Sequence, residues 1–123
     1  MKRLILEIGS GADLYGMDYT KAAVRALNDA IRHSSITLFA SLGIDHAEME
    51  VKVTIGVQEP KKVNLDALLT QIPRGNPKIR AQFGGQNIES RSGSEFSVVV
   101  TCAIEAYVPD LSTRYQVNST PKD

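Results

Sequence analysis

The chain has 123 residues, 14 basic and 14 acidic side chains, a formal net charge of zero and 42% hydrophobic residues. This length suits one domain, and the composition is that of a folded globular protein, not a disordered chain. The neutral charge balance argues against nucleic-acid and membrane partners, and the single cysteine excludes an internal disulfide. No stretch approaches the roughly 20 apolar residues that cross a bilayer. We therefore expect a cytoplasmic protein.

The chain opens with a short alternating segment. Residues 3–8 predict a strand whose more apolar side carries Leu6 and Ile8. The glycines that follow are expected to break this strand and to open a loop over residues 9–16. Asp18 is then expected to cap a helix over residues 19–34, because apolar residues recur there at helical spacing.

The middle of the chain predicts further regular elements. Residues 36–42 predict a second helical segment, and the alternation over 48–57 predicts a strand with one apolar side. Asn64 is expected to cap a short helix over 65–72, which Pro73 follows.

Two strands close the predicted fold. They cover residues 78–83 and 96–108, and Gly84 with Gly85 interrupts the chain between them. The last strand is longer than one small sheet needs, which indicates curvature, a bulge or pairing beyond the subunit. We expect one domain over residues 1–109 and a polar tail over 110–123 that frays or lies on a neighbouring subunit.

The element order β-α-β-α-β-β predicts an α+β fold. It is a two-layer sandwich in which two helices cover one face of a mixed four-stranded sheet. This order is similar to that of the trimeric chorismate-mutase and enamine-deaminase folds, whose uncovered sheet faces meet and whose active sites lie between subunits. The resemblance, with Val99, Ala103 and Tyr107 on the uncovered side of the last strand, implies a homo-oligomer, either a trimer or another multiple.

The glycine-containing segment after the first strand is the most informative part of the sequence. Leu14 stands where a dinucleotide fingerprint needs its third glycine, and the Gly-Lys-Ser/Thr ending of a P-loop is absent. Backbone amides in such a loop, together with a helix N-terminus, can bind an oxyanion or phosphate. The alternative is a tight turn followed by a helix cap, and the residue types leave both interpretations open.

On the binding interpretation, Asp13 orients or deprotonates the ligand and Lys21 holds an anionic or polar group, so these two are the candidate catalytic residues. The sequence does not decide whether any reaction is catalysed. The candidate ligand-binding residues are Gly9, Ser10, Gly11, Tyr15, Gly16, Asp18, Thr20 and Arg25.

The same segment resembles a small family of uncharacterised proteins from bacteria and plants. Their signature after the first strand is G-x-G-x-D-x-H-G, followed by T-K-A-A-x-R-A; this chain has GSGADLYG and TKAAVRA. Tyr15 stands in place of the family histidine, and because its ordinary pKa is about 10 it replaces a metal ligand or proton shuttle poorly. The resemblance implies no established function and supplies only a location for a site.

Other reactive side chains point to structural roles. His33 is expected to end the first helix, His46 to lie on the surface, and Cys102 to pack in the core, so we expect no metal site and no cofactor. The sequence therefore predicts a protein that binds or converts a small polar or anionic metabolite, with a pocket at a subunit interface built around the segment Gly9–Gly16. The alternative is a non-enzymatic oligomeric module for regulation or interaction.

Overall fold

The computed structural model has the α+β class that the sequence predicts. The predicted helical segment over 36–42, His46 and the tail over 110–123 lie outside the described residues. The described residues are 2–33, 48–72, 76–93 and 95–108.

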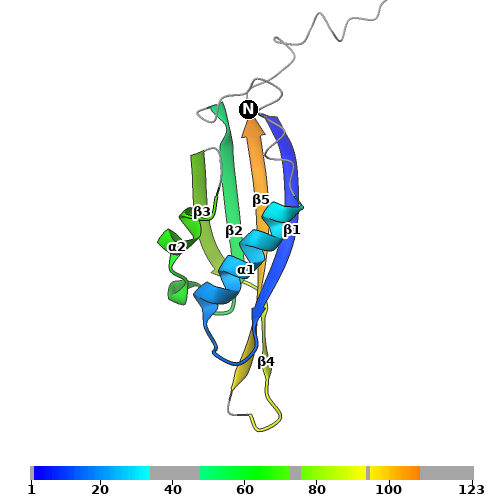
Figure 1. Cartoon of the computed structure of the whole chain (residues 1–123), viewed down its shortest axis with the longest axis vertical. Helices are drawn as coiled ribbons and strands as arrows, with labels where there is room; N and C mark the ends of the chain where they lie inside the picture. Colours follow the sequence, from blue (N-terminus) through cyan, green and yellow to red (C-terminus); the bar gives the residue numbers. More distant parts are fainter. Residues whose placement is uncertain (1, 34–47, 73–75, 94, 109–123) are drawn as a thin grey trace, which may run out of the picture.

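Five strands form one mixed sheet (Figure 1): β1 Lys2–Asp13, β2 Glu50–Val57, β3 Asn76–Phe83, β4 Gln86–Glu89 and β5 Phe96–Val108. Four of them lie in the order β1-β5-β2-β3, and β4 pairs with the start of β5. β5 is antiparallel to β1, β2 and β4, whereas β2 and β3 are parallel. The main sheet therefore has the four predicted strands, and β4 is a fifth strand in a stretch where no strand was predicted.

Both helices lie on one face of the sheet, as predicted (Figure 1). α1 spans Tyr19–Arg32 and packs over β1 and β5, and the short α2, Leu65–Leu69, lies beside it near β3. Asp18 caps α1 by accepting a hydrogen bond from the backbone N–H of Lys21, and Asn64 caps α2. A 3-10 turn over Pro60–Lys62 precedes α2. No helix within the described ranges is both long enough and apolar enough to cross a membrane.

The core lies between α1 and the sheet. Alternate residues of β2 and β5 point toward the helices, and the residues between them point away. This alternation places aliphatic side chains of both central strands against one face of α1, where their removal from water stabilises the fold. The buried residues of α1 are Tyr19, Ala22, Ala23, Ala26, Leu27 and Ala30.

β1 runs further than its sequence predicts, because its glycines continue the strand. Gly9 and Gly11 pair with β5, so the predicted loop over residues 9–16 is wrong over residues 9–13 and begins only after β1 ends. A Cβ atom on Gly9 would lie 2.4 Å from the backbone nitrogen of Ala30, and one on Gly11 would lie 2.3 Å from that of Ala26. The backbone of α1 therefore packs directly on the backbone of β1, which glycine alone permits.

The apolar side of β1 faces away from the helices. Leu6 and Ile8 are 49% and 58% exposed, and they pair with residues of β5 whose side chains also point away from α1. We call this uncovered side of the sheet the open face.

The length of β5 follows from its pairing. β1 occupies one edge of β5 over almost its full length, and β2 and β4 share the other edge in succession. A shift of register between Arg3 and Ile5 adds an irregularity to β1. The full length of β5, which is more than one small sheet needs, is therefore explained by strand pairing within the chain.

Candidate functional site

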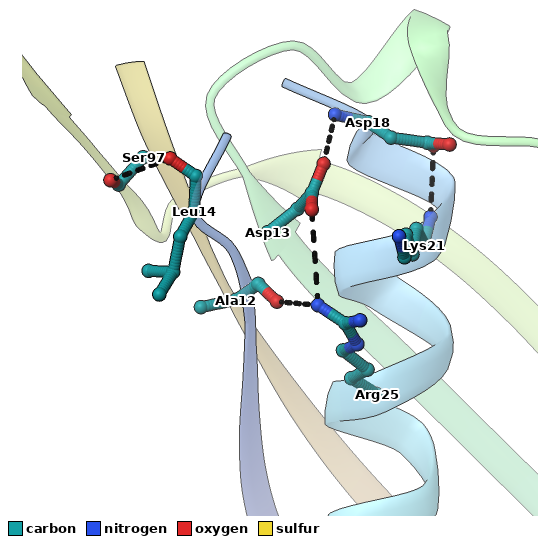
Figure 2. A network of polar contacts seen from close by, with 7 residues as sticks. All are labelled: Ala12, Asp13, Leu14, Asp18, Lys21, Arg25 and Ser97. Carbon is teal, nitrogen blue, oxygen red and sulfur yellow. Dashed lines mark hydrogen bonds and ion pairs between the residues drawn. The ribbon is translucent and has the colours of Figure 1, made fainter. Parts of the chain in front are cut away.

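Asp13, the predicted acid or base, is buried at the end of β1, and its carboxylate binds groups of its own chain (Figure 2). Its Oδ2 accepts a hydrogen bond from the backbone N–H of Asp18 at 2.9 Å, and its Oδ1 lies 3.8 Å from Nη1 of Arg25. The same nitrogen of Arg25 donates to the carbonyl of Ala12 at 2.6 Å. A Cβ atom on Gly16 would lie 2.8 Å from Oδ2, so the loop turns closely around the carboxylate. Asp13 therefore joins the end of β1 to the start of α1.

Other polar groups of this segment also join elements of the fold. The hydroxyl of Thr20 accepts a hydrogen bond from the backbone N–H of Asn64 at 2.9 Å and donates to the carbonyl of Lys62 at 3.4 Å. The backbone N–H of Ser10 donates to Asp29 at 3.0 Å, and this bond is the main cause of the lowered pKa of that carboxyl group. These contacts give the segment a structural role that needs no ligand.

Two predicted site residues in this segment have exposed side chains. Tyr15 is 81% exposed, and Lys21 uses its backbone N–H to complete the cap of Asp18 while its side chain is exposed. The other predicted polar groups lie where β1 ends and α1 begins, whereas Gly9 and Ser10 lie further back along β1 beside α1. Ligand binding by this segment stays a prediction.

The open face presents its side chains in rows that cross the strands. Two neighbouring rows are apolar on β1 and mostly polar or basic on β2 and β3. The register places Leu6, Glu105, Lys52 and Lys78 in one row, and Ile8, Ala103, Thr54 and Arg80 in the next.

A hollow of about 310 Å³ lies in the basic half of the open face. Three cationic side chains line it: Lys52 and Lys78 lie opposite each other on β2 and β3, and Arg80 lies two residues further along β3. Like charges that face each other across neighbouring strands destabilise a sheet. Among the described residues, none of the three forms an ion pair. The hollow therefore holds positive charge that an anion would neutralise.

Glu105 also lines the hollow, but its negative charge is already stabilised by two other side chains. It accepts hydrogen bonds from the hydroxyl of Tyr107 at 2.7 Å and from Nη1 of Arg3 at 3.2 Å. The bond from Tyr107, followed by the contacts of Arg3 and the nearby charge of Lys52, lowers the pKa of Glu105, and the bond from Tyr107 also raises the pKa of that tyrosine. Nζ of Lys52 lies 5.0 Å from the centre of the Tyr107 ring. Glu105 is thus ionised at neutral pH and does not compensate all the cations of the hollow.

The remaining reactive residues have structural roles. Cys102 is buried in the core, as predicted, and burial raises the pKa of its thiol to about 12, which disfavours the reactive thiolate. His33 ends α1 as its C-cap. Within the described ranges, no three His, Cys, Asp or Glu side chains gather as a metal site would require.

The sequence-based prediction missed the hollow. The sequence feature that could have indicated it is two pairs of polar residues, each spaced to lie on one side of a strand: Lys52 with Thr54 and Lys78 with Arg80. Each pair looks like the wet side of an ordinary strand when it is considered alone. The site becomes visible only when β2 and β3 are known to be parallel neighbours with this register.

Comparisons with known proteins agree with the predicted resemblance to an uncharacterised family. The sequence model of a family described as "Conserved hypothetical protein (Lin0512_fam)" matches residues 3–106. A crystal structure of an FtsZ-like protein of unknown function from Nostoc punctiforme is similar with a TM-score of 0.71 and 28% sequence identity, over 85% of this chain and 93% of that chain. A comparison with curated proteins gives no significant match.

Proposed function

Because the chain belongs to the conserved hypothetical family Lin0512_fam, whose function is not established, we propose a function from the site geometry: the hollow on the open face binds a small anionic metabolite. The observation that supports this proposal most strongly is the group of Lys52, Lys78 and Arg80, which share one hollow and form no ion pair with any described residue. The class of ligand is the one that the sequence predicts. The proposed location differs from the predicted one: it is the hollow on the open face and not the segment between β1 and α1.

The arrangement favours a ligand group with two negative charges, such as a phosphate monoester. Two ammonium groups and one guanidinium surround one location, and a phosphate monoester offers three acceptor oxygens to such donors. Nε of Arg80 donates to the hydroxyl of Thr54 at 3.4 Å, which holds the guanidinium beside β2 and leaves its two terminal nitrogens for the ligand. The proposal concerns binding and assigns no reaction.

Isothermal titration with inorganic phosphate tests the proposal. The double variant Lys78→Ala/Arg80→Ala is expected to bind phosphate about 100-fold more weakly than the wild type, because two charge-assisted contacts are lost. The matched control is Lys21→Ala/Lys61→Ala, which removes the same charge from exposed side chains elsewhere. Undiminished binding by the first variant would contradict the proposal. Lost binding by the control would return the site to the segment around Asp13.

Self-association through the open face is a second candidate function, favoured by the exposure of Leu6 and Ile8 beside the hollow. We propose that a second copy of the chain covers this apolar half, since every copy offers the same patch and the patch continues from Ile8 onto its partner Ala103 of β5. Light scattering at micromolar concentration should show a multimer. Ile8→Lys should lower the mass, while Leu69→Lys on α2, where the side chain is 41% exposed, should leave it unchanged. A monomeric wild type would contradict this candidate.

A further inference from the structure

We infer that the ligand of the hollow is a phosphate ester that carries a hydroxyl group, as in a polyol or sugar phosphate, and that Glu105 accepts a hydrogen bond from this hydroxyl. The inference rests on the proposed function and adds a second recognition element to it. The phosphate binds to the cations on β2 and β3, and the hydroxyl binds on β5.

The two oxygens of the Glu105 carboxylate have different surroundings. The hydroxyl of Tyr107 and Nη1 of Arg3 both donate to Oε2. Within the described part of the chain, Oε1 accepts no hydrogen bond. The side chain lines the hollow and is 24% exposed. An ionised carboxylate has about four acceptor positions, so Oε1 is an acceptor whose capacity the fold leaves for a ligand.

The spacing of the strands sets the size of the ligand. Glu105 lies on β5 and Lys78 lies on β3, with Lys52 of β2 between them in the same row. Neighbouring strands are about 4.8 Å apart, so the outer two positions of this row are separated by about 10 Å. A phosphate held among the cations therefore lies several ångströms from Oε1. A hydroxyl two or three carbon atoms away from the phosphate spans that gap.

The charges around Glu105 favour a hydroxyl over an ammonium group as the donor. Lys52 lies next to Glu105 in the row and Lys78 follows it, so a second positive charge on the ligand would be repelled. A neutral hydroxyl donates to Oε1 without this cost. Recognition of this kind discriminates strongly, because an analogue without the hydroxyl leaves a partly buried acceptor without its partner.

The test compares two probes that differ only in their hydroxyl groups, sn-glycerol 3-phosphate and n-propyl phosphate, by isothermal titration. The wild type should bind the glycerol ester about tenfold more tightly. In Glu105→Ala the ratio of the two affinities should fall to about one, while propyl phosphate binds at least as tightly as before because a negative charge has been removed. Glu89→Ala, which removes an exposed carboxylate from β4, is the control and should keep the wild-type ratio.

Each outcome separates the inference from the proposed function. Equal binding of both esters by the wild type overturns the inference alone, and this comparison needs no variant to fold. A tenfold ratio that survives in Glu105→Ala also overturns it, because another acceptor then recognises the hydroxyl. Failure of the wild type to bind inorganic phosphate or either ester overturns the proposed function, and the inference falls with it.

Discussion

The two faces of the sheet differ in how fully the fold pairs their charged residues. On the face that α1 covers, the residues of the distinctive segment find partners inside the chain: Asp13 binds the backbone of Asp18, and Thr20 binds the turn before α2. On the open face, Lys52 and Lys78 face each other without an ion pair to any described residue. The distinctive segment around Asp13 therefore has contacts that stabilise the fold. The positive charges of Lys52 and Lys78, which no described residue pairs and which lie on strands without a distinctive motif, indicate a candidate binding site.

The largest expected effect concerns the covered face. Gly11→Ala should lower the free energy of unfolding by about 3 kcal/mol, because its Cβ atom would lie 2.3 Å from the backbone nitrogen of Ala26 and the helix must move. Urea denaturation measures this change. The control is Gly93→Ala in the loop after β4, where φ is +74° but nothing lies within 4 Å of a Cβ atom, so strain alone should cost about 1 kcal/mol. Equal effects of the two substitutions would contradict direct packing of α1 on β1.

The next effect separates folding from binding. Asp13→Asn should lower the free energy of unfolding by about 2 kcal/mol, because the charged acceptor for the N–H of Asp18 and the contact with Arg25 are both lost. The affinity for phosphate should stay unchanged. Thermal unfolding and titration of the same sample measure both quantities. A variant of normal stability that no longer binds phosphate would show that Asp13 acts on a ligand.

A smaller effect of opposite sign is expected on the open face. Lys78→Gln should raise the free energy of unfolding by about 0.5 kcal/mol at low salt, because it removes a like charge opposite Lys52. The gain should vanish when salt screens the pair or when phosphate binds the wild type. Urea denaturation with and without salt tests this, and Lys61→Gln on the 3-10 turn is the matched control. A loss of stability in Lys78→Gln would mean that the cation has a partner in the fold.

The smallest effect depends on pH and involves Glu105. Its pKa is lowered mainly by the hydrogen bond from Tyr107, so its contribution to stability is present above the unfolded pKa and is lost as the pH falls through the folded pKa. Tyr107→Phe should raise the pKa of Glu105 toward its ordinary value and should destabilise the fold slightly at neutral pH. The difference between variant and wild type should shrink as the pH falls below about 4. An NMR titration of the Glu105 carboxyl carbon measures the shift, and an unchanged pKa would contradict the assigned cause.

Much of the fold follows from local patterns in the sequence. The alternation in β2 and β5, the helical spacing of α1 and the two cap residues Asp18 and Asn64 are all confirmed. These features depend on neighbours a few residues apart, so the sequence contains the information that determines them. β4 was missed because four residues between turns carry too little pattern.

The candidate site was harder to predict because it depends on contacts that are distant in the sequence. Gly9 and Gly11 suggested a flexible loop, but their role is set by the close approach of α1, which local sequence does not reveal. The cations of β2 and β3 meet through the parallel pairing of two strands that are separated by a helix. The side chains of Tyr15 and Lys21 are exposed, and neither of them lines the hollow on the open face. Their role in binding stays a prediction.

The most direct test of the account is a phosphate titration followed by amide NMR chemical shifts along the whole chain. The account predicts that the shifts concentrate on β2 around Lys52–Thr54, on β3 around Lys78–Arg80 and on β5 near Glu105. The segment from Gly9 to Lys21 should stay unchanged. Shifts that concentrate in that segment instead, or the absence of any shift, would contradict the claim that the open face is the binding face.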